Sequence, residues 1–446
     1  MKRIVILGSG ESGTGAAILA KKFGFDVFVS DKGAIPQKYK EELQQHAIAF
    51  EELQHTEALI LNADEIIKSP GIPEKNELIQ KLRSLNISII SEIEFASRYT
   101  NAFIIAITGT NGKTTVTSLV YHLLQKAGLN VACGGNIGVS FARLVAEKNY
   151  DYFVLEISSF QLDDMHAFHA NIAVLTNITP DHLDRYNYDL QNYINSKFRI
   201  TQNQTKADYF IYCADDELTT KNLQQYTNAQ MVPFSFNPSL AAGATVMDGN
   251  IYVQISNNQL NPFTMSTTQL ALRGRHNTYN SLAAALIGKA LEIKNEVIRE
   301  ALTDFKNVEH RLENVATVDG IQFINDSKAT NVNAAWYALE CMDKPVIWIA
   351  GGTDKGNDYT MLKELVKDKV RMIVCMGLDN SKIHEAFSKD VDFIVNTTSA
   401  NEAVKVAKQF AKSGECVLLS PACASFDLFK NYEERGRMFK NAVRSL

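Results

Sequence analysis

Residues 104–115 combine a short apolar run with a glycine-rich turn that ends in a lysine and two threonines. Backbone N–H groups in such a turn can surround phosphate oxygens, and the N-terminus of the following helix adds its dipole. Lys113 can then reach the β- and γ-phosphates of a nucleotide, and the Thr114 hydroxyl can bind Mg²⁺. Ile107 replaces the first glycine of the full motif, so an ordinary glycine turn is the alternative. The order of strand, loop, lysine, hydroxyl and helix favours a nucleoside triphosphate site.

A second glycine-rich loop, Gly8–Gly13, follows the apolar residues 4–7 and precedes a helical pattern over residues 14–23. The next predicted strand, over residues 26–30, ends at Asp31. This is the G-x-G-x-x-G pattern with an acidic residue at about the spacing found in dinucleotide-binding folds. Taken alone, the loop predicts an NAD-dependent oxidoreductase, and this class stays open at this point.

Two further polar side chains follow predicted strands near the phosphate loop. Glu156 ends the strand over residues 152–155, where a second protein ligand for Mg²⁺ is needed. The alternative, a surface glutamate, is disfavoured because the preceding run reads as buried. His182 follows the strand over residues 172–175 and is flanked by aspartates, so we expect it to contact metal or phosphate. Lys197, in a helix predicted over 188–202, would by spacing alone be a solvent-exposed lysine.

Strands and helices alternate along the chain in three successive units, which predicts α/β domains with mostly parallel sheets. We expect domains over residues 1–92, 93–305 and 306–446, the third unit beginning near Asn307. The first and third are expected to be Rossmann-like and the second a phosphate-loop ATPase type. Short alternating runs within about residues 231–272 predict antiparallel strands, and a break is expected over residues 92–101. The other predicted strands are 66–69, 87–90, 103–107, 130–133, 209–213, 322–325, 346–350, 372–376, 393–395 and 416–420, and further helices are predicted over 116–127, 277–290 and 294–302.

The composition is that of an ordinary globular protein, with 46% hydrophobic and 21% charged residues among 446. A net charge of -5 without a long basic block argues against a nucleic-acid partner. The six cysteines include no C-x-x-C pair and read as reduced thiols of a cytoplasmic protein. The apolar run after Met1 stops at Gly8, too early for a signal peptide, and no run is long enough to cross a membrane. We therefore expect no membrane partner.

Together these motifs resemble the Mur ligase family of bacterial cell-wall synthesis, in order and over the whole chain. Within the family, the Ser420–Ser425 run and the N-terminal loop resemble the member that adds D-glutamate to UDP-N-acetylmuramoyl-L-alanine. The signature of the diaminopimelate- or lysine-adding member is absent. The resemblance rests on Gly109–Thr114, Gly135–Gly138, Glu156 with Ser158–Gln161, Asp181–Asp184, Lys197, His276-Asn277, His310-Arg311, Asn325–Asn331, Gly351-Gly352 with Lys355, and Ser420–Asp427.

The resemblance implies that the first loop holds the UDP of the substrate rather than NAD. It implies a monomer that uses ATP and two Mg²⁺ ions, with the alanine carboxylate phosphorylated and then attacked by the amine of D-glutamate. The UDP-substrate residues would be Ser9, Gly10, Glu11, Ser12, Asp31, Lys32, Asn136, Ser158, Gln161 and His182. The ATP residues would be Gly109, Thr110, Asn111, Gly112, Lys113, Thr114, Thr115, Asn277, Asn280, Arg311 and Asp326.

The resemblance also implies the metal ligands and the D-glutamate pocket. Thr114 and Glu156 would bind one metal ion, and His182 and a carbamoylated Lys197 the other. Lys113, His182, Lys197 and Lys328 would be catalytic. Closure of the third domain would exclude water from the acyl phosphate. D-Glutamate would be bound by Lys328, Thr330, Lys355, Ser425 and Tyr432, the last standing where the family is expected to have phenylalanine.

Several alternatives stay open. The residues alone predict equally well that the Pro421–Ser425 run starts a helix capped by Ser425. The enzyme could also be another Mur ligase or a folylpolyglutamate-synthase-like ligase, since these share the ATPase core. The oxidoreductase and a non-catalytic nucleotide switch are alternatives from other classes.

Overall fold

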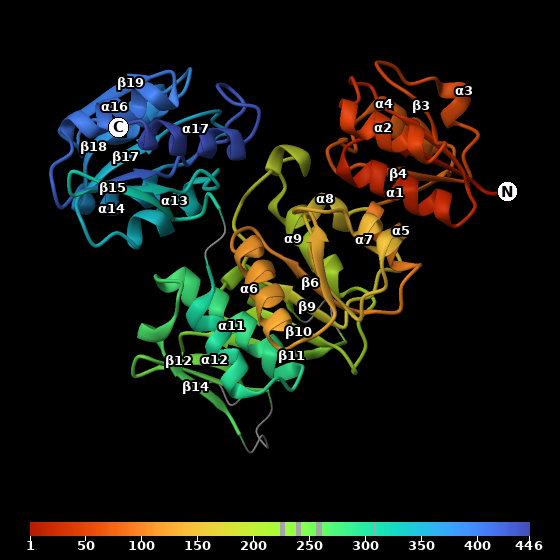
Figure 1. Ribbon diagram of the computed structural model, residues 1–446, viewed down its shortest axis with the longest axis horizontal. Coiled ribbons are helices and arrows are strands. Elements are labelled where there is room, and N and C mark those ends of the chain that lie inside the picture. The colour runs from red at the N-terminus through yellow and green to blue at the C-terminus, as the bar shows by residue number, and fades with distance from the viewer. Residues whose placement is uncertain (224–227, 238–241, 256–260, 307–308) are drawn as a thin grey trace. The chain divides into compact units, whose positions relative to one another are not determined.

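The computed structural model describes residues 1–223, 228–237, 242–255, 261–306 and 309–446 (Figure 1). Three β-sheets of five, nine and six strands follow one another along the chain. Contacts divide the chain into two compact units. The first unit, Met1–Ala271 with Tyr279–Phe305, holds the first two sheets, and the second, Leu272–Thr278 with Lys306–Leu446, holds the third. Within the described residues, no helix is long and apolar enough to span a membrane.

The first sheet is entirely parallel, with strand order β3-β2-β1-β4-β5. The apolar run of β1 is buried on both faces, as expected for a parallel strand covered by helices. The direction in which successive strands are added to the sheet reverses at β1. The loops that follow β1 and β4 therefore lie next to each other at the carboxyl ends of these strands. The elements are β1 (Arg3–Leu7), α1 (Glu11–Lys22), β2 (Asp26–Ser30), α2 (Gln37–Gln45), β3 (Ala49–Glu51), α3 (Glu57–Ile60), β4 (Glu65–Lys68), α4 (Glu77–Ser84) and β5 (Ser88–Ile90).

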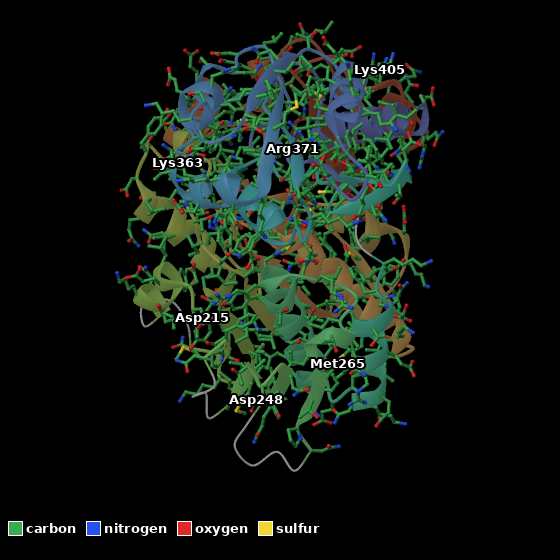
Figure 2. All side chains as sticks on the ribbon, turned by 90° about the vertical axis from the view of Figure 1, so that its left-hand side faces the viewer. Asp215, Asp248, Met265, Lys363, Arg371 and Lys405 are labelled. Carbon is green, nitrogen blue, oxygen red and sulfur yellow. The ribbon has the colours of Figure 1, made fainter. Side chains whose placement is uncertain are left out.

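The second sheet has the order β14-β13-β12-β11-β10-β9-β6-β8-β7. Strands from β7 through to β12 pair in parallel, and β12, β13 and β14 pair antiparallel. Asp248, labelled in Figure 2, lies in the turn between β12 and β13. The elements are α5 (Glu92–Ser97), β6 (Phe103–Thr108), α6 (Lys113–Lys126), β7 (Val131–Gly135), α7 (Phe141–Glu147), β8 (Tyr152–Glu156), α8 (Ser159–Leu162), β9 (Ile172–Leu175), α9 (Leu190–Phe198), β10 (Tyr209–Cys213), α10 (Glu217–Asn222), β11 (Gln230–Ser235), β12 (Gly243–Met247), β13 (Asn250–Gln254), β14 (Phe263–Ser266), α11 (Arg275–Ala290) and α12 (Asn295–Asp304).

The third sheet, coloured cyan to blue in Figure 1, has the order β15-β16-β20-β17-β18-β19 and is parallel except for β15. Trp348 of β17 is fully buried, and its indole N–H donates to the Ser420 carbonyl (2.7 Å). Arg371 of β18, labelled in Figure 2, pairs with Glu415 (2.8 Å). The elements are β15 (Glu313–Val318), β16 (Ile321–Asn325), α13 (Val332–Glu340), β17 (Val346–Ala350), α14 (Lys363–Lys369), β18 (Val370–Met376), α15 (Ser381–Phe387), β19 (Phe393–Thr397), α16 (Ala400–Phe410), β20 (Cys416–Leu419) and α17 (Tyr432–Arg444).

The predicted α/β class with three mostly parallel sheets is confirmed, but several boundaries differ. Antiparallel pairing begins only at β12, since β11 pairs in parallel with β10, and residues 238–241 and 256–260 of the predicted antiparallel region lie outside the described residues. Helix α9 begins later than predicted because Asn187 and Tyr188 adopt left-handed backbone angles, and it ends earlier because a 3-10 helix over Arg199–Thr201 follows it. The strands β3 and β15 were not predicted. Asn307 lies outside the described residues.

The stretch over residues 92–101, predicted as a break, contains α5, and α5 attaches to the second sheet through buried carboxylates. Glu94 accepts the backbone N–H groups of His166, Ala167 and Phe168 (3.1, 3.1 and 2.8 Å). Glu92 accepts the N–H of Ala142 through one oxygen, and its other oxygen has no partner among the described residues. Because burial penalises the charged form, the pKa of Glu92 rises to about 8.

We expect Glu92→Gln to stabilise the protein more at pH 8 than at pH 5. Between an ordinary glutamate pKa and about 8, the unfolded chain releases a proton that the folded chain retains, so stability falls as pH rises. Glutamine removes this dependence, and the gain at pH 8 should be on the order of 2–4 kcal/mol. Urea midpoints at both pH values measure the effect. Glu147→Gln, at an exposed position of α7, is the control, and an equal gain at both pH values would contradict the assignment.

Candidate active site

The phosphate loop starts where β6 ends, and the segment after β9 holds it in place. The N–H groups of Thr110 and Asn111 donate to the carbonyl and side-chain oxygens of Asn177 (2.9 and 3.0 Å). Gly109 has a φ of +144°, and a Cβ there would lie 1.9 Å from the Thr176 hydroxyl. A Cβ on Gly112 would lie 2.6 Å from the side-chain oxygen of Asn280. The loop therefore depends on glycine at two positions.

Two lysines meet at one carbonyl oxygen of this loop. Lys113 and Lys197 each donate to the Gly109 carbonyl at 2.8 Å, and Lys113 also donates to the Thr110 carbonyl. Lys197 is 2% exposed, so the interpretation from spacing alone, a solvent-exposed helix lysine, is wrong. Burial, followed by the nearby charge of Lys113, holds the pKa of Lys197 well below its usual value. Lys197 therefore releases its proton more readily than an ordinary lysine does.

A carboxylate connects the ends of three neighbouring strands beside the loop. Glu156, at the end of β8, accepts from the Thr114 hydroxyl (2.6 Å) and from the Asn136 amide (2.8 Å). Glu156 pairs in register with Ile107 of β6 and Gly135 of β7, which brings these side chains together. It is 2% exposed, so the alternative of a surface glutamate is wrong. A hydroxyl and a buried carboxylate oxygen in contact are ligands that suit Mg²⁺, so these residues fit such an ion.

His182 follows β9 in a left-handed conformation with a φ of +53°. Its ring lies 3.7 Å from the Asp181 carboxylate and packs edge-on against Phe160, with ring centroids 5.1 Å apart. The side chain is 38% exposed, so a ligand can reach it. Ser158 and Gln161 form a capping box at the start of α8, in which the Gln161 side-chain oxygen accepts from the Ser158 N–H (2.9 Å). Their S-x-x-Q spacing is a signal for this structural role that the sequence interpretation missed.

The N-terminal loop lies at the point where the first sheet changes direction. Asp31 accepts from the Ser9 N–H and hydroxyl through one oxygen (2.7 and 2.6 Å) and from the Gly33 N–H through the other (2.8 Å). Glu11 accepts from Arg143 (2.8 Å) and from the N–H of Ser140 at the start of α7 (3.1 Å). The candidates Gly10 and Lys32 are exposed, and Ser12 is partly exposed. The loop is therefore tied both to β2 and to α7.

A separate cavity of about 760 Å³ lies in the first unit. Its lining includes the buried residues Lys68 and Asp164 and the half-exposed Arg83. Lys68 and Arg83 pair with Asp164 at N–O distances of 2.9 and 2.6 Å. None of the residues predicted for the UDP substrate lines it among the described residues. Phe160, which lines the cavity, packs against the ring of His182, one of the predicted residues.

In the second unit, the loops after β16, β17 and β20 converge because these strands are neighbours in the sheet. Asp326 accepts from the Ser420 hydroxyl (2.9 Å), and burial raises the pKa of Asp326 to about 6. Thr353 and Ala424 exchange two backbone hydrogen bonds (2.8 and 3.2 Å). Residues 421–425 form a loop and α17 begins only at Tyr432, so the helix start capped by Ser425 is wrong.

Four of the candidate D-glutamate residues lie on these loops, and the fifth, Tyr432, is the first residue of α17. The Lys328 ammonium lies 5.4 Å from the centre of the Tyr432 ring. Ser425 is buried, Thr330 is partly exposed and Lys355 is exposed. The sequence therefore placed all five residues on segments that the third sheet gathers at one end.

Arg435 supports two of these loops and was missed by the sequence interpretation. It is 1% exposed and donates to the Ser327 carbonyl (2.8 Å) and the Cys423 carbonyl (3.1 Å). Burial lowers the pKa of Arg435 to about 10, which leaves it charged at neutral pH. An arginine in a helix that is otherwise rich in charge carries no sequence signal for burial.

The remaining ATP candidates belong to both units. Asn280 belongs to the first unit, whereas Asn277, Arg311 and Asp326 belong to the second. Asn277 is buried, and its side chain donates to the Arg273 carbonyl (2.8 Å). Burial and the charge of Arg311 lower the pKa of the neighbouring His276 to about 3.

Comparison of the sequence and the fold with known proteins identifies the protein family. The Mur ligase middle domain matches residues 107–288, the Mur ligase glutamate ligase domain matches residues 310–423, and the MurD N-terminal domain matches residues 3–78. A solved structure of UDP-N-acetylmuramate-alanine ligase from Thermotoga maritima shares the fold, with a TM-score of 0.64 at 19% identity over all of both chains. The chain belongs to the Mur ligase family.

Relatives of one kind within this family match the chain from end to end. It is 55% identical over 446 residues to the UDP-N-acetylmuramoylalanine--D-glutamate ligase of Christiangramia forsetii, covering 100% of each chain. It is 56% identical over 448 residues to the protein of the same name from Bacteroides fragilis, again covering 100% of each.

We expect Gly109→Ala to abolish nucleotide binding and to destabilise the first unit by more than about 2 kcal/mol. A side chain there would meet Thr176 and adopt a strained backbone angle. Calorimetric titration with ATP and urea unfolding measure the two effects. Gly71→Ala is the matched control because nothing lies within 4 Å of a Cβ at that position. ATP binding by Gly109→Ala at the wild-type affinity would contradict the loop assignment.

Proposed function

We propose that this protein joins D-glutamate to the alanine carboxylate of UDP-N-acetylmuramoyl-L-alanine, a step in the synthesis of peptidoglycan precursors. The observation that carries the proposal is full-length identity of 55% and 56% to relatives named for this ligation. Mur ligases are ATP-dependent, amide-bond-forming enzymes. Residues 3–78 match the MurD N-terminal domain. This agreement over all three domains separates the protein from other Mur ligases and from folylpolyglutamate-synthase-like enzymes.

The reaction proceeds in two chemical steps. The alanine carboxylate oxygen attacks the γ-phosphorus of ATP, so that ADP leaves and an acyl phosphate forms. The amine of D-glutamate then attacks the acyl carbon, and the tetrahedral intermediate expels phosphate and loses a proton. Lys113 swings from the Gly109 and Thr110 carbonyls to the γ-phosphate, where its charge offsets the repulsion between carboxylate and triphosphate.

The residues of the first unit fit two Mg²⁺ ions, which would neutralise the charge that develops on the transferred phosphoryl group. We assign Thr114 and Glu156 to one ion on the basis of their 2.6 Å contact and burial. We assign His182 and Lys197 to the other. The lowered pKa of Lys197 favours its neutral amine, which would attack CO₂ and release a proton to give a carbamate anion. This converts a cation into a metal ligand.

The substrate assignments follow the family resemblance, residue by residue. Ser9, Gly10, Glu11, Ser12, Asp31 and Lys32 are assigned to the UDP end, and Asn136, Ser158, Gln161 and His182 to the sugar and peptide. Lys328, Thr330, Lys355, Ser425 and Tyr432 are assigned to D-glutamate, whose two carboxylates require cations and hydroxyls. Gly109–Thr115, Asn277, Asn280, Arg311 and Asp326 are assigned to ATP.

The alternative of an NAD-dependent oxidoreductase is opposed by the full-length identity of 55% and 56% to relatives that are named ligases. We further propose that the enzyme is a cytoplasmic monomer, because its substrates are soluble nucleotides and all six cysteines are free thiols.

Substrate use tests the function directly. Purified protein with ATP, Mg²⁺ and UDP-N-acetylmuramoyl-L-alanine should release phosphate with D-glutamate and not with L-alanine, L-lysine or diaminopimelate. Oxygen-18 in the alanine carboxylate should appear in the released phosphate, since acyl phosphate formation transfers that atom. Lys113→Ala should lose ligation while UDP-sugar binding persists. Turnover of ATP without an amide product would instead support a nucleotide switch.

We expect Lys197→Ala to reduce the ligation rate at least about a hundredfold, and short carboxylic acids to restore part of it by replacing the carbamate. ¹³C-labelled bicarbonate should give a carbamate carbon signal in the wild type that the variant lacks. Lys206→Ala, an exposed lysine shortly after α9, is the matched control and should keep full activity. A fully active Lys197→Ala variant would contradict a role as metal ligand.

A further inference from the structure

Three metal-binding side chains gather in the second unit, and none of them is assigned to the ligation reaction. His276 lies in the first turn of α11, Glu340 is the last residue of α13, and Cys341 follows it directly. One ligand atom from each side chain lies within 4.8 Å of the other two. All three side chains are partly shielded from solvent. We refer to them as the His–Glu–Cys cluster.

The spacing of the two softer ligands matches a tetrahedral zinc site. The Cys341 sulfur lies 3.5 Å from the His276 Nδ1 atom. Typical Zn–S and Zn–N bonds of about 2.3 and 2.0–2.1 Å at a tetrahedral angle place sulfur and nitrogen about 3.6 Å apart. An S–H···N hydrogen bond has a similar length, so the third side chain distinguishes the two arrangements.

Glu340 has one carboxylate oxygen that is buried and has no hydrogen-bond partner among the described residues. Leaving such an acceptor unsatisfied is costly, and native proteins rarely do so without a bound group. A thiol–imidazole hydrogen bond leaves this oxygen unsatisfied. A cation bound between the three side chains satisfies it.

The backbone holds the ligands in place without a metal. A Cβ on Gly274, which has a φ of +90°, would lie 2.2 Å from the Cys341 sulfur, so glycine makes room for that atom. The Lys369 ammonium donates to the carbonyls of Leu339, Glu340 and Met342 (3.3, 2.7 and 3.0 Å), which fixes the end of α13. This preorganisation reduces the entropy lost when a metal binds.

A second cluster in the same unit shows the contrast. Glu309 and Glu313 both accept from Lys440 (2.7 and 2.6 Å), and the His310 ring is hydrogen-bonded to Asn325 (2.8 Å). The half-buried ammonium of Lys440 already supplies the positive charge there, so this cluster has no need of a metal cation.

We propose that His276, Glu340 and Cys341 bind one Zn²⁺ ion, with water as the fourth ligand. The thiolate and the carboxylate together neutralise the dication, and the imidazole adds no charge. A thiolate and an imidazole favour zinc over the harder Mg²⁺ that the ligation reaction uses. The ion would connect α11 to α13 across more than sixty residues of sequence.

Cobalt titration of the full-length, metal-free protein tests the site. One equivalent of Co²⁺ should produce a thiolate-to-cobalt charge-transfer band and the visible bands of a tetrahedral ion, and Zn²⁺ but not excess Mg²⁺ should abolish them. Cys341→Ser should remove the charge-transfer band, and Glu340→Gln should weaken Co²⁺ binding more than about tenfold. Cys133→Ala and Glu309→Gln are the matched controls and should bind as the wild type does.

Stability supplies a second readout that is independent of ligation. Zn²⁺ should raise the unfolding midpoint of the wild type and of Cys133→Ala, but not that of Cys341→Ser, while all metal-free variants should have native circular dichroism spectra. Absence of the charge-transfer band in the folded wild type, or its persistence in Cys341→Ser, would overturn the proposal. Neither result would affect the proposed ligase function, because no residue of the cluster is assigned to it.

Discussion

The carboxylate of Glu156 is the interaction on which the central site depends. It joins the phosphate-loop helix to the end of β7 through Thr114 and Asn136, and it does so at the end of a strand between them. A buried carboxylate is tolerated only when its oxygens are satisfied. The Thr114 hydroxyl and the Asn136 amide meet this need. The same residue thus fixes the start of α6 relative to the end of β7.

Electrostatics organises the site around that carboxylate. Lys113 and Lys197 share the Gly109 carbonyl, which brings two cationic groups together in a position with little water. Desolvation and mutual repulsion act in the same direction and favour the neutral form of the more deeply buried Lys197. The pKa of Lys197 is therefore lower than that of an ordinary lysine. The surroundings of a lysine side chain, here burial and a second nearby ammonium, thus change its acidity.

Much of this arrangement could be predicted from the sequence, because it follows from local patterns. The order of strand, glycine turn and helix placed Lys113 and Thr114 correctly, and the polar residue after a buried strand placed Glu156. The burial of Lys197 could not be read from its helix, since it depends on the Gly109 carbonyl some ninety residues away. Arg435 was missed for the same reason: its partners are the Ser327 and Cys423 carbonyls, which only the folded sheet brings to it. The edge strand β15 alternates exposed and half-buried residues and carries a weak apolar signal.

The burial of Arg435 in α17 also limits how many residues can be removed from the C-terminal end without disturbing the fold. Leu446 is 43% exposed and the last three residues are exposed, so an affinity tag fused there extends into solvent. A truncation that reaches Arg435, in contrast, deletes the donor beneath two loops at once and leaves their carbonyls buried without partners. Shortening the protein for crystallisation should therefore stop well beyond that residue.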